Sequence, residues 1–368
     1  MQSSSNNSRL TQTLVQVMVV GDSQVVGDMV EGILDRDARI QVSARPADGE
    51  KAITQFRTTE AEVVVIDIGD NPQQSLTTIS RLLRIDAKAR IVMVSTLNFT
   101  NVKTGLEGLE RGAVEFLQTP AIHTKDSSHV VFQHNLAESV FELGMARREE
   151  GERLARKTPS PPATDATITL RPASAQPPKI LVIASSTGGP KALVTVLAGL
   201  SASVVVPILI AQHMPPVFTG ALAQNIARTS GRPCAEGIDG EYLKPGHVYV
   251  APGDYHMLLE RAGGGVCIRV NQETRENYCR PSAEPLFRSA AKIYGPTTLG
   301  LVLTGMGNDG AVGAKAITQA GGTIIAQDQK TCVVWGMPGT VAKAGLCSAV
   351  LGLGEIAAYL NSVATYKP

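Results

Sequence analysis

The sequence has few aromatic residues, no long apolar run and no basic block, and the last two absences each exclude a class of protein. Aromatic residues make up 4% of the 368 residues, and the formal net charge is +1. Because nucleic-acid-binding and membrane-surface proteins usually carry excess Lys and Arg, we expect no nucleic-acid partner. No apolar run reaches about 18 residues, so we expect no membrane insertion. Residues 1–9 are rich in Ser and Asn and do not resemble a signal peptide, which predicts a cytoplasmic location.

Cysteine is also scarce, and no two cysteines have the Cys-x-x-Cys spacing that is typical of metal sites. The count is odd, which predicts reduced thiols rather than a disulfide framework. We expect these residues to be small buried hydrophobic side chains rather than catalytic groups. They are Cys234, Cys267, Cys279, Cys332 and Cys347.

The chain is longer than one hydrophobic core usually serves, and its composition divides it into three parts. Between residues 14 and 125, short Val- and Ile-rich runs alternate with amphipathic stretches, which predicts a doubly wound parallel α/β sheet. Residues 126–178 contain a helical stretch and then a Pro-rich segment, which predicts a connecting helix and a flexible or extended linker. The alternation resumes over residues 179–368, where we expect a second doubly wound α/β domain.

Three predicted strands of the second domain end in residues that can perform chemistry. The apolar run at 180–184 leads to Ser186, the run at 205–211 leads to His213, and the run at 299–303 leads to Asp309. Because the carboxyl ends of parallel strands meet at one edge of a sheet, we expect these side chains to converge. A serine hydroxyl becomes a nucleophile when a base takes its proton, and a carboxylate can fix the tautomer of that base. The pattern therefore predicts a Ser-His-Asp triad for acyl transfer.

Each of these residues also has a structural interpretation. The Thr-Gly-Gly sequence after Ser186 is compatible with a plain strand-to-helix turn or with a phosphate cradle. His213 could be a loop histidine, and Asp309 could cap a helix. The triad interpretation depends on all three residues lying at strand ends of the same domain.

Five short motifs occur in order along residues 179–368. They are IASSTGG at 183–189, AQHMP at 211–215, YVAPGD at 249–254, RPS at 280–282 and LTGMGNDG at 303–310. Together they resemble the catalytic domain of the chemotaxis receptor methylesterases, the CheB family. Each motif alone is weak, but their order over about half the chain is specific.

The resemblance implies hydrolysis of glutamate methyl esters on methyl-accepting chemoreceptors, with deamidation of receptor glutamines by the same acyl-enzyme route. It places the nucleophile on Ser186 rather than Ser185. It also implies that Thr187 and Met306 line the oxyanion site and that Arg280 contacts substrate. It implies no metal and no organic cofactor for catalysis.

Residues 14–125 resemble a response-regulator receiver, which has a flavodoxin-like fold. Asp67 occupies the position of the phospho-accepting aspartate, and Ser95 occupies that of the hydroxyl switch residue. Asp22 matches one of the two acidic residues that hold Mg²⁺ beside the phospho-acceptor. The resemblance implies a chemotaxis histidine kinase as a partner.

Two receiver positions depart from the family pattern. Gly21 replaces the second acidic residue, and Thr119 replaces the lysine that contacts the phosphoryl group. A hard cation prefers several oxygen ligands, so one carboxylate fewer weakens the site. We therefore expect weak Mg²⁺ binding at Asp22 and Asp67, and an activity that depends little on phosphorylation of Asp67.

Two other functions are compatible with the same fold. One is a regulator that binds a phosphate-containing ligand, although neither a Gly-x-Gly-x-x-Gly motif nor a Walker lysine is present. The other is a non-catalytic signalling adaptor, although all three triad residues are present. His256 and Trp335 could lie at the rim of the cleft, and a structural role is the alternative for each.

Overall fold

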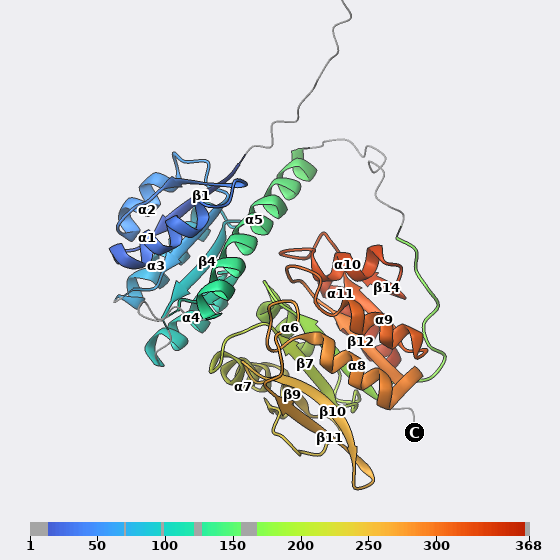
Figure 1. The fold of residues 1–368 in the computed structure, drawn as a ribbon. Coiled ribbons are helices and arrows are strands. Elements are labelled where there is room, and N and C mark those ends of the chain that lie inside the picture. The colour runs from blue at the N-terminus through green and yellow to red at the C-terminus, as the bar shows by residue number, and fades with distance from the viewer. Residues whose placement is uncertain (1–13, 70, 97–98, 121–126, 156–167, 365–368) are drawn as a thin grey trace, which may run out of the picture.

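The computed structural model describes residues 14–69, 71–96, 99–120, 127–155 and 168–364. These residues form two α/β units, each built on a parallel sheet with helices packed against it (Figure 1). The predicted fold class, two doubly wound α/β domains, is confirmed.

The first unit is a five-stranded sheet in the order β2-β1-β3-β4-β5, and all its neighbouring strands are parallel. This is the strand order of flavodoxin-like folds. The strands are β1 (Val15–Val20), β2 (Ile40–Ala44), β3 (Val63–Asp67), β4 (Arg90–Ser95) and β5 (Glu115–Gln118). The helices between them are α1 (Gln24–Leu34), α2 (Gly49–Phe56), α3 (Pro72–Ile85) and α4 (Phe99–Arg111). The helices α1, α2 and α3 begin at Ser23, Asp48 and Asn71, whose side chains accept backbone N–H groups of the first turn.

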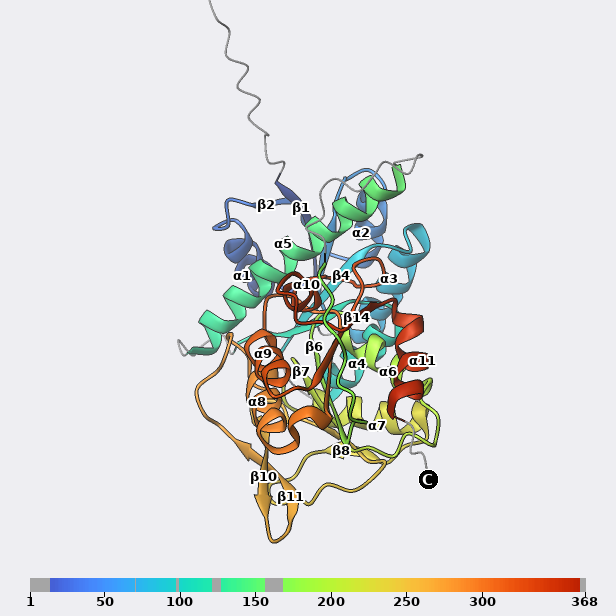
Figure 2. The same ribbon diagram turned by 90° about the vertical axis from the view of Figure 1, so that its right-hand side faces the viewer.

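Helix α5 (Ser127–Ala155) lies along the first unit, on the side that faces the second unit (Figures 1 and 2). Its apolar stripe includes Leu136, Val140 and Leu143, which are fully buried in one cluster with Val15 of β1. Burial of each such side chain contributes about 1.5–3 kcal/mol to the free energy of unfolding. The packing therefore makes this predicted connecting helix part of the core of the first unit.

The end of the Pro-rich segment lies against the second unit. The backbone N–H of Arg171 donates to the carbonyl of Cys347 at 3.0 Å, and that of Ser174 donates to Thr323 Oγ1 at 2.9 Å. Residues 168–178 are thus held by the second unit rather than spanning between the two. The rest of the predicted linker, residues 156–167, lies outside the described residues.

The second unit is a seven-stranded parallel sheet in the order β14-β13-β12-β6-β7-β9-β8. Its strands are β6 (Ile180–Ser185), β7 (Ile208–Gln212), β8 (Cys234–Glu236), β9 (Val248–Val250), β12 (Thr298–Val302), β13 (Thr323–Gln327) and β14 (Ala349–Leu351). An antiparallel pair, β10 (His256–Ala262) and β11 (Gly265–Asn271), stands beside the sheet. The helices are α6 (Gly189–Ala198), α7 (Phe218–Ser230), α8 (Ala283–Tyr294), α9 (Ala311–Gln319), α10 (Met337–Lys343) and α11 (Leu353–Ala364), with a 3₁₀ turn at Gly295–Thr297.

Strand β6 lies inside this sheet and is buried on both faces. Ile180 and Val182 pack into the cluster on one face, and Leu181 and Ile183 pack into the cluster on the other. This alternation follows from the two-residue period of a strand. It explains why the strand is a continuous apolar run, and it fixes the strand's carboxyl end between the ends of β7 and β12.

The two units meet through an apolar contact. Phe218, the first residue of α7, is fully buried in a core cluster of the first unit, and its ring lies 4.3 Å from that of Phe116 on β5. A Cβ on Gly105 of α4 would lie 2.9 Å from the Phe218 ring, so the absence of a side chain there permits the approach. Burial of one phenylalanine contributes about 1.5–3 kcal/mol to this docking.

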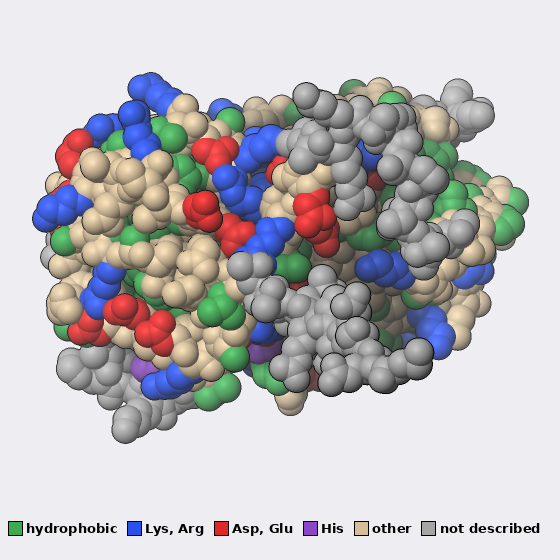
Figure 3. Space-filling model, turned by 90° about the horizontal axis from the view of Figure 1, so that it is seen from above, with side chains coloured by type: hydrophobic (Ala, Val, Ile, Leu, Met, Phe, Trp, Pro, Cys, Tyr) green, Lys and Arg blue, Asp and Glu red, His purple; other side chains and the backbone are tan. Residues whose placement is uncertain are grey.

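The surface carries both signs of charge. In Figure 3, basic and acidic side chains are interspersed over the face that is not covered by grey atoms. In the described part of the chain, no helix is long and apolar enough to span a bilayer.

Candidate active site

Ser186 lies immediately after β6, at the carboxyl edge of the second sheet. Its N–H donates to the carbonyl of Thr304 at 3.0 Å, and a Cβ on Gly305 would lie 2.8 Å from Ser186 Cβ, so only glycine leaves room there. Gly188 caps α6 with a φ of 77°, a left-handed conformation that favours glycine. The turn thereby places Ser186 at the beginning of a helix, where N–H groups can face a negative charge.

Ser185, the neighbouring hydroxyl, faces the interior. It is fully buried and donates to Gln212 Oε1 at 2.7 Å, while Gln212 Nε2 donates to the carbonyls of Ser186 and His213. The amide of Gln212 therefore ties the ends of β6 and β7 together. Ser186, in contrast, lines a cavity.

His213 follows β7 and contacts Asp309, which follows β12. His213 Nε2 and Asp309 Oδ2 are 2.8 Å apart, although 96 residues separate them in the sequence. The predicted convergence at the sheet edge occurs because β12, β6 and β7 are neighbours in the strand order.

Asp309 is held by three further donors. Its Oδ1 accepts from Asn277 Nδ2 at 2.8 Å and from the Ser282 hydroxyl, and its Oδ2 accepts from the Ala283 backbone N–H at 2.7 Å. These hydrogen bonds and the contact with His213 favour the ionised form. They hold the pKa of Asp309 below its ordinary value, although burial acts to raise that pKa.

Cys279 contacts the other ring nitrogen of His213. Its Sγ lies 3.3 Å from His213 Nδ1, and in the described part of the chain no hydrogen bond joins Ser186 to that ring. Burial acts to lower the pKa of His213, but the contacts with Cys279 and Asp309 outweigh burial and raise that pKa well above 6.5. Nδ1 of His213 faces Cys279 rather than Ser186 in this arrangement, so this nitrogen can accept the proton of Ser186 only after the contact with Cys279 changes.

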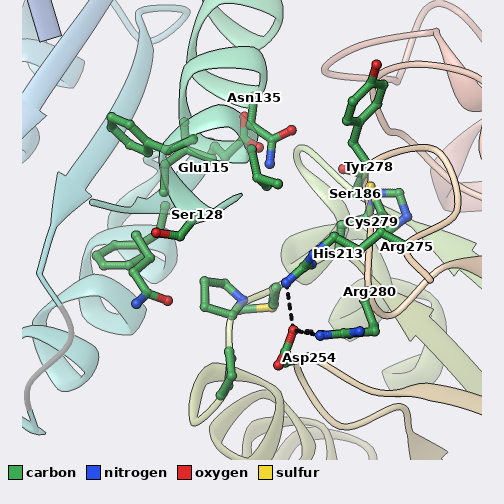
Figure 4. Close-up of a pocket in the computed structure, with 18 of the residues that line it drawn as sticks. Glu115, Ser128, Asn135, Ser186, His213, Asp254, Arg275, Tyr278, Cys279 and Arg280 are labelled. Atoms are coloured by element: carbon green, nitrogen blue, oxygen red, sulfur yellow. Dashed lines mark hydrogen bonds and ion pairs between the residues drawn. The ribbon is translucent and has the colours of Figure 1, made fainter. Parts of the chain in front are cut away.

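A cavity of about 400 Å³ lies between the two units and contains these groups. Figure 4 shows Glu115, Ser128 and Asn135 of the first unit on one side, facing the side that carries Ser186 and His213. The walls thus come from both units. The first unit covers the serine while the two are docked.

The other predicted site residues lie close to this cavity. Met306 lines it, and Thr187 is buried beside it. Arg280 also lines it, but this guanidinium is bound to the Asp254 carboxylate and to the carbonyls of Gln272 and Glu273. Arg280 therefore holds its loop as well as facing the cavity. A second arginine, Arg275, shares Asp254 through its Nη2 at 2.6 Å.

The first unit also contacts the turn that follows Ser186. Thr187 Oγ1 donates to Glu115 Oε2 at 3.1 Å, and the Gly188 N–H donates to the Val114 carbonyl at 3.0 Å. Burial raises the pKa of Glu115 to about 7, against the hydrogen bonds from Ser139 and Thr187 and the charge of His213. A carboxyl of the first unit is thus held next to the residue that was expected to line the oxyanion site.

Comparison with known proteins identifies the family of this chain. The family model described as CheB methylesterase matches residues 181–360. A protein-glutamate methylesterase/protein-glutamine glutaminase of Rhodospirillum rubrum is 43% identical over 364 residues, 94% of each chain. The chain belongs to the CheB methylesterase family. A Paramagnetospirillum magneticum relative with the same description is 41% identical over 370 residues, covering 96% of this chain and 97% of its own.

A solved structure of the Thermotoga maritima CheB methylesterase catalytic domain is 42% identical and covers 50% of this chain and 98% of its own, with a TM-score of 0.49. The family membership makes this chain a carboxylic ester hydrolase of the CheB type. It does not favour the alternatives of a phosphate-ligand regulator or a non-catalytic adaptor.

The acidic site of the receiver-like unit is sparse. Asp22 and Asp67 both line a small cavity of about 40 Å³, with Gly21 where a second acidic residue was expected. Among the described residues, no group of three or more His, Cys, Asp or Glu side chains could hold a metal. Asp70 in the adjacent loop lies outside the described residues. The donor set is thus small for a hard cation, and weak Mg²⁺ binding stays a prediction.

Thr119 and Ser95 are both buried at the end of that sheet. The Thr119 hydroxyl has no hydrogen-bond partner among the described residues, and the Ser95 hydroxyl accepts from Asn101 Nδ2 at 2.7 Å. The threonine side chain is shorter than that of lysine, and its hydroxyl carries no charge. It therefore cannot make the charge-assisted contact that a lysine makes with phosphoryl oxygens.

The sequence left open whether His256 and Trp335 lie at the rim of the cleft, and in this arrangement both make structural contacts. His256 is buried, with Nε2 against the Thr274 carbonyl and Nδ1 accepting from the Ser282 N–H. Trp335 donates from Nε1 to the Gln327 carbonyl at 3.1 Å and packs against the hydrophobic cluster that contains Ile180 and Val182. Neither lines the cavity that contains Ser186. The five cysteines are all free thiols.

Proposed function

We propose that the chain hydrolyses glutamate methyl esters on proteins, and deamidates glutamines, through an acyl-enzyme on Ser186. The observation that carries this proposal is the pair of His213 and Asp309, 2.8 Å apart, in the cavity that Ser186 lines. Family membership supplies the class of reaction, and the geometry supports the choice of residues.

In the proposed reaction, His213 takes the proton of Ser186 as the hydroxyl attacks the ester carbonyl. Asp309 holds the imidazole through Nε2, so the nitrogen left to act as the base is Nδ1. The same imidazole then gives its proton to the leaving methanol, or to ammonia when the substrate is glutamine. Water hydrolyses the acyl-enzyme by the same route in reverse order.

The negative charge of the tetrahedral intermediate would face the beginning of α6. The N–H groups of the turn and the partial positive charge of the helix terminus stabilise an oxyanion there. We propose that Thr187 and Met306 line this position, while Arg280 fixes the opposite wall through Asp254.

The docked arrangement is a resting state under this proposal. Nδ1 of His213 contacts Cys279 instead of Ser186, and the first unit closes the cavity. Substrate binding therefore requires the receiver-like unit to move away.

The proposed substrates are the methyl-accepting chemoreceptors, which the chain would meet in the cytoplasm, and the proposed upstream partner is a chemotaxis histidine kinase. The test is to mix the full chain with membranes carrying methylated receptors and to measure methanol, and with unmodified receptors to measure ammonia. An ester hydrolase releases methanol in proportion to the receptor methyl groups. A protein that binds these membranes and releases neither product is an adaptor, and the proposal would be wrong.

A further inference from the structure

Two consecutive residues of the receiver-like unit bind two consecutive donors beside the proposed nucleophile. Glu115 accepts from the Thr187 hydroxyl at 3.1 Å, and the Val114 carbonyl accepts from the Gly188 N–H at 3.0 Å. Both donors belong to the turn that connects Ser186 to α6. This turn is where a substrate carbonyl and its developing charge would lie.

The side chain that occupies this position has the chemistry of the reaction product. Hydrolysis of a glutamate methyl ester leaves a glutamate carboxylate, and Glu115 presents the same group on the same length of chain. Glu115 also lines the cavity that contains Ser186 and His213. Figure 4 shows it on the wall opposite them, projecting from the receiver-like unit.

A plain contact between domains would not need this carboxyl. Burial of a carboxyl is costly unless it is hydrogen-bonded, and the Phe116–Phe218 contact already gives the interface an apolar centre. Glu115 is nevertheless half-buried at the interface, where its carboxylate accepts from the Thr187 hydroxyl. The Thr187 hydroxyl of the catalytic unit thus binds a glutamyl carboxyl directly beside the proposed nucleophile.

We propose that the Thr187 hydroxyl and the Gly188 N–H form a binding site for a glutamyl carboxyl group, and that Glu115, with the Val114 carbonyl on the second donor, occupies this site as an internal product mimic. The identity of the ligand rests on the proposed function. The site has two occupants, the side chain of Glu115 when the units are docked and the glutamyl group of the protein substrate when they separate.

An internal ligand competes with substrate without changing the chemistry. It lowers the fraction of the enzyme that is competent to bind, so it raises KM and leaves kcat at saturation unchanged. Removal of Glu115 should therefore lower KM for a methylated receptor substrate about tenfold, the scale of one hydrogen bond to a charged group. A general distortion of the catalytic unit would change kcat instead.

The test compares full-length Glu115→Ala with the wild type and with Glu107→Ala. Glu107 is the matched control because it is a glutamate of the same unit that pairs with Arg111 on α4, away from the cavity. We expect a lower KM, an unchanged kcat and faster labelling of Ser186 by a serine-reactive phosphonate in Glu115→Ala alone. A receptor peptide that carries free glutamates should also inhibit Glu115→Ala more strongly than the wild type.

A second variant separates the carboxyl from the docking itself. Phe116→Ala removes the apolar contact but keeps Glu115, so it should speed the labelling of Ser186 without strengthening inhibition by the free glutamyl peptide. If Glu115→Ala matched the wild type in KM, labelling rate and peptide inhibition, the product-mimic inference would be overturned. If the wild type released no methanol, the proposed function would fail, and the labelling rates of Glu115→Ala and Glu107→Ala would still decide whether Glu115 covers the serine.

Discussion

At the scale of single residues, the carboxylate of Asp309 orients His213 and is itself oriented by Asn277 and Ser282. We predict that Asp309→Asn lowers kcat by about 10⁴, because the amide selects the wrong imidazole tautomer. Asn277→Ala removes one donor and keeps the charge of Asp309, so it should lower kcat by only about tenfold. Steady-state kcat on a methylated receptor substrate measures both. Equal losses in the two variants would contradict the role given to the Asp309 charge.

The contact between Cys279 and His213 gives a second prediction at this scale. Iodoacetamide should inactivate the enzyme in step with modification of Cys279, because this thiol lines the cavity and contacts the imidazole of His213. Burial raises the pKa of Cys234 and of Cys347 to about 12, so these thiols should react slowly. Peptide mass spectrometry locates the label. The variant Cys279→Ala should resist, and its inactivation at the wild-type rate would show that another residue is involved.

The sequence predicted some of these residues and not others, for a physical reason. Ser186, His213 and Asp309 follow apolar runs, so strand order alone brings them to one edge. Asn277 and Cys279 lie on the loop between β11 and α8. No periodic pattern in the sequence predicts the path of this loop. Their contacts with Asp309 and His213 could be found only from coordinates.

At the scale of secondary-structure elements, docking of the two units depends on pH through Glu115 on β5. Burial raises the pKa of Glu115 from 4.5 to about 7 in the docked state, so docking binds a proton. This contribution to docking is fully present below pH 4.5 and is lost as the pH rises through about 7. Labelling of Ser186 by a phosphonate should therefore increase more steeply with pH in the wild type than in Glu115→Gln, where residue 115 does not titrate.

The measurement is the ratio of the two labelling rates as a function of pH, since both proteins keep Ser186 and His213. A ratio that stays constant between pH 5 and pH 8 would contradict the raised pKa of Glu115, which is about 7.

Helices and strands were predictable where local pattern decides them. The apolar stripe of Leu136, Val140 and Leu143 marks α5 as a helix with one buried face. The sequence did not reveal that this face joins the core around β1, because a helical stripe shows that a face is buried and not what covers it. The contact of Glu115 with Thr187 was hidden for the same reason.

At the scale of the whole molecule, activation depends on how strongly phosphorylation shifts the docking of the two units. A modification shifts such an equilibrium only through different interactions in the two states. Thr119 offers no charge and Gly21 no carboxylate, so little differential energy is available when Asp67 is phosphorylated. We predict that acetyl phosphate with Mg²⁺ raises methanol release by less than about tenfold. A larger activation that disappears in Asp67→Ala would restore an ordinary phospho-switch.

Methanol release by the matched variants Ser186→Ala and Ser185→Ala tests the account most directly. The two serines are neighbours, but Ser185 is buried against Gln212 whereas Ser186 lines the cavity with His213. On methylated receptor membranes, we predict that Ser186→Ala loses about 10⁶ in turnover, the scale of losing a triad serine. Ser185→Ala loses a buried hydrogen bond and should stay within about tenfold of the wild type. Near-normal methanol release by Ser186→Ala, with loss of release in Ser185→Ala, would contradict the assignment of the nucleophile.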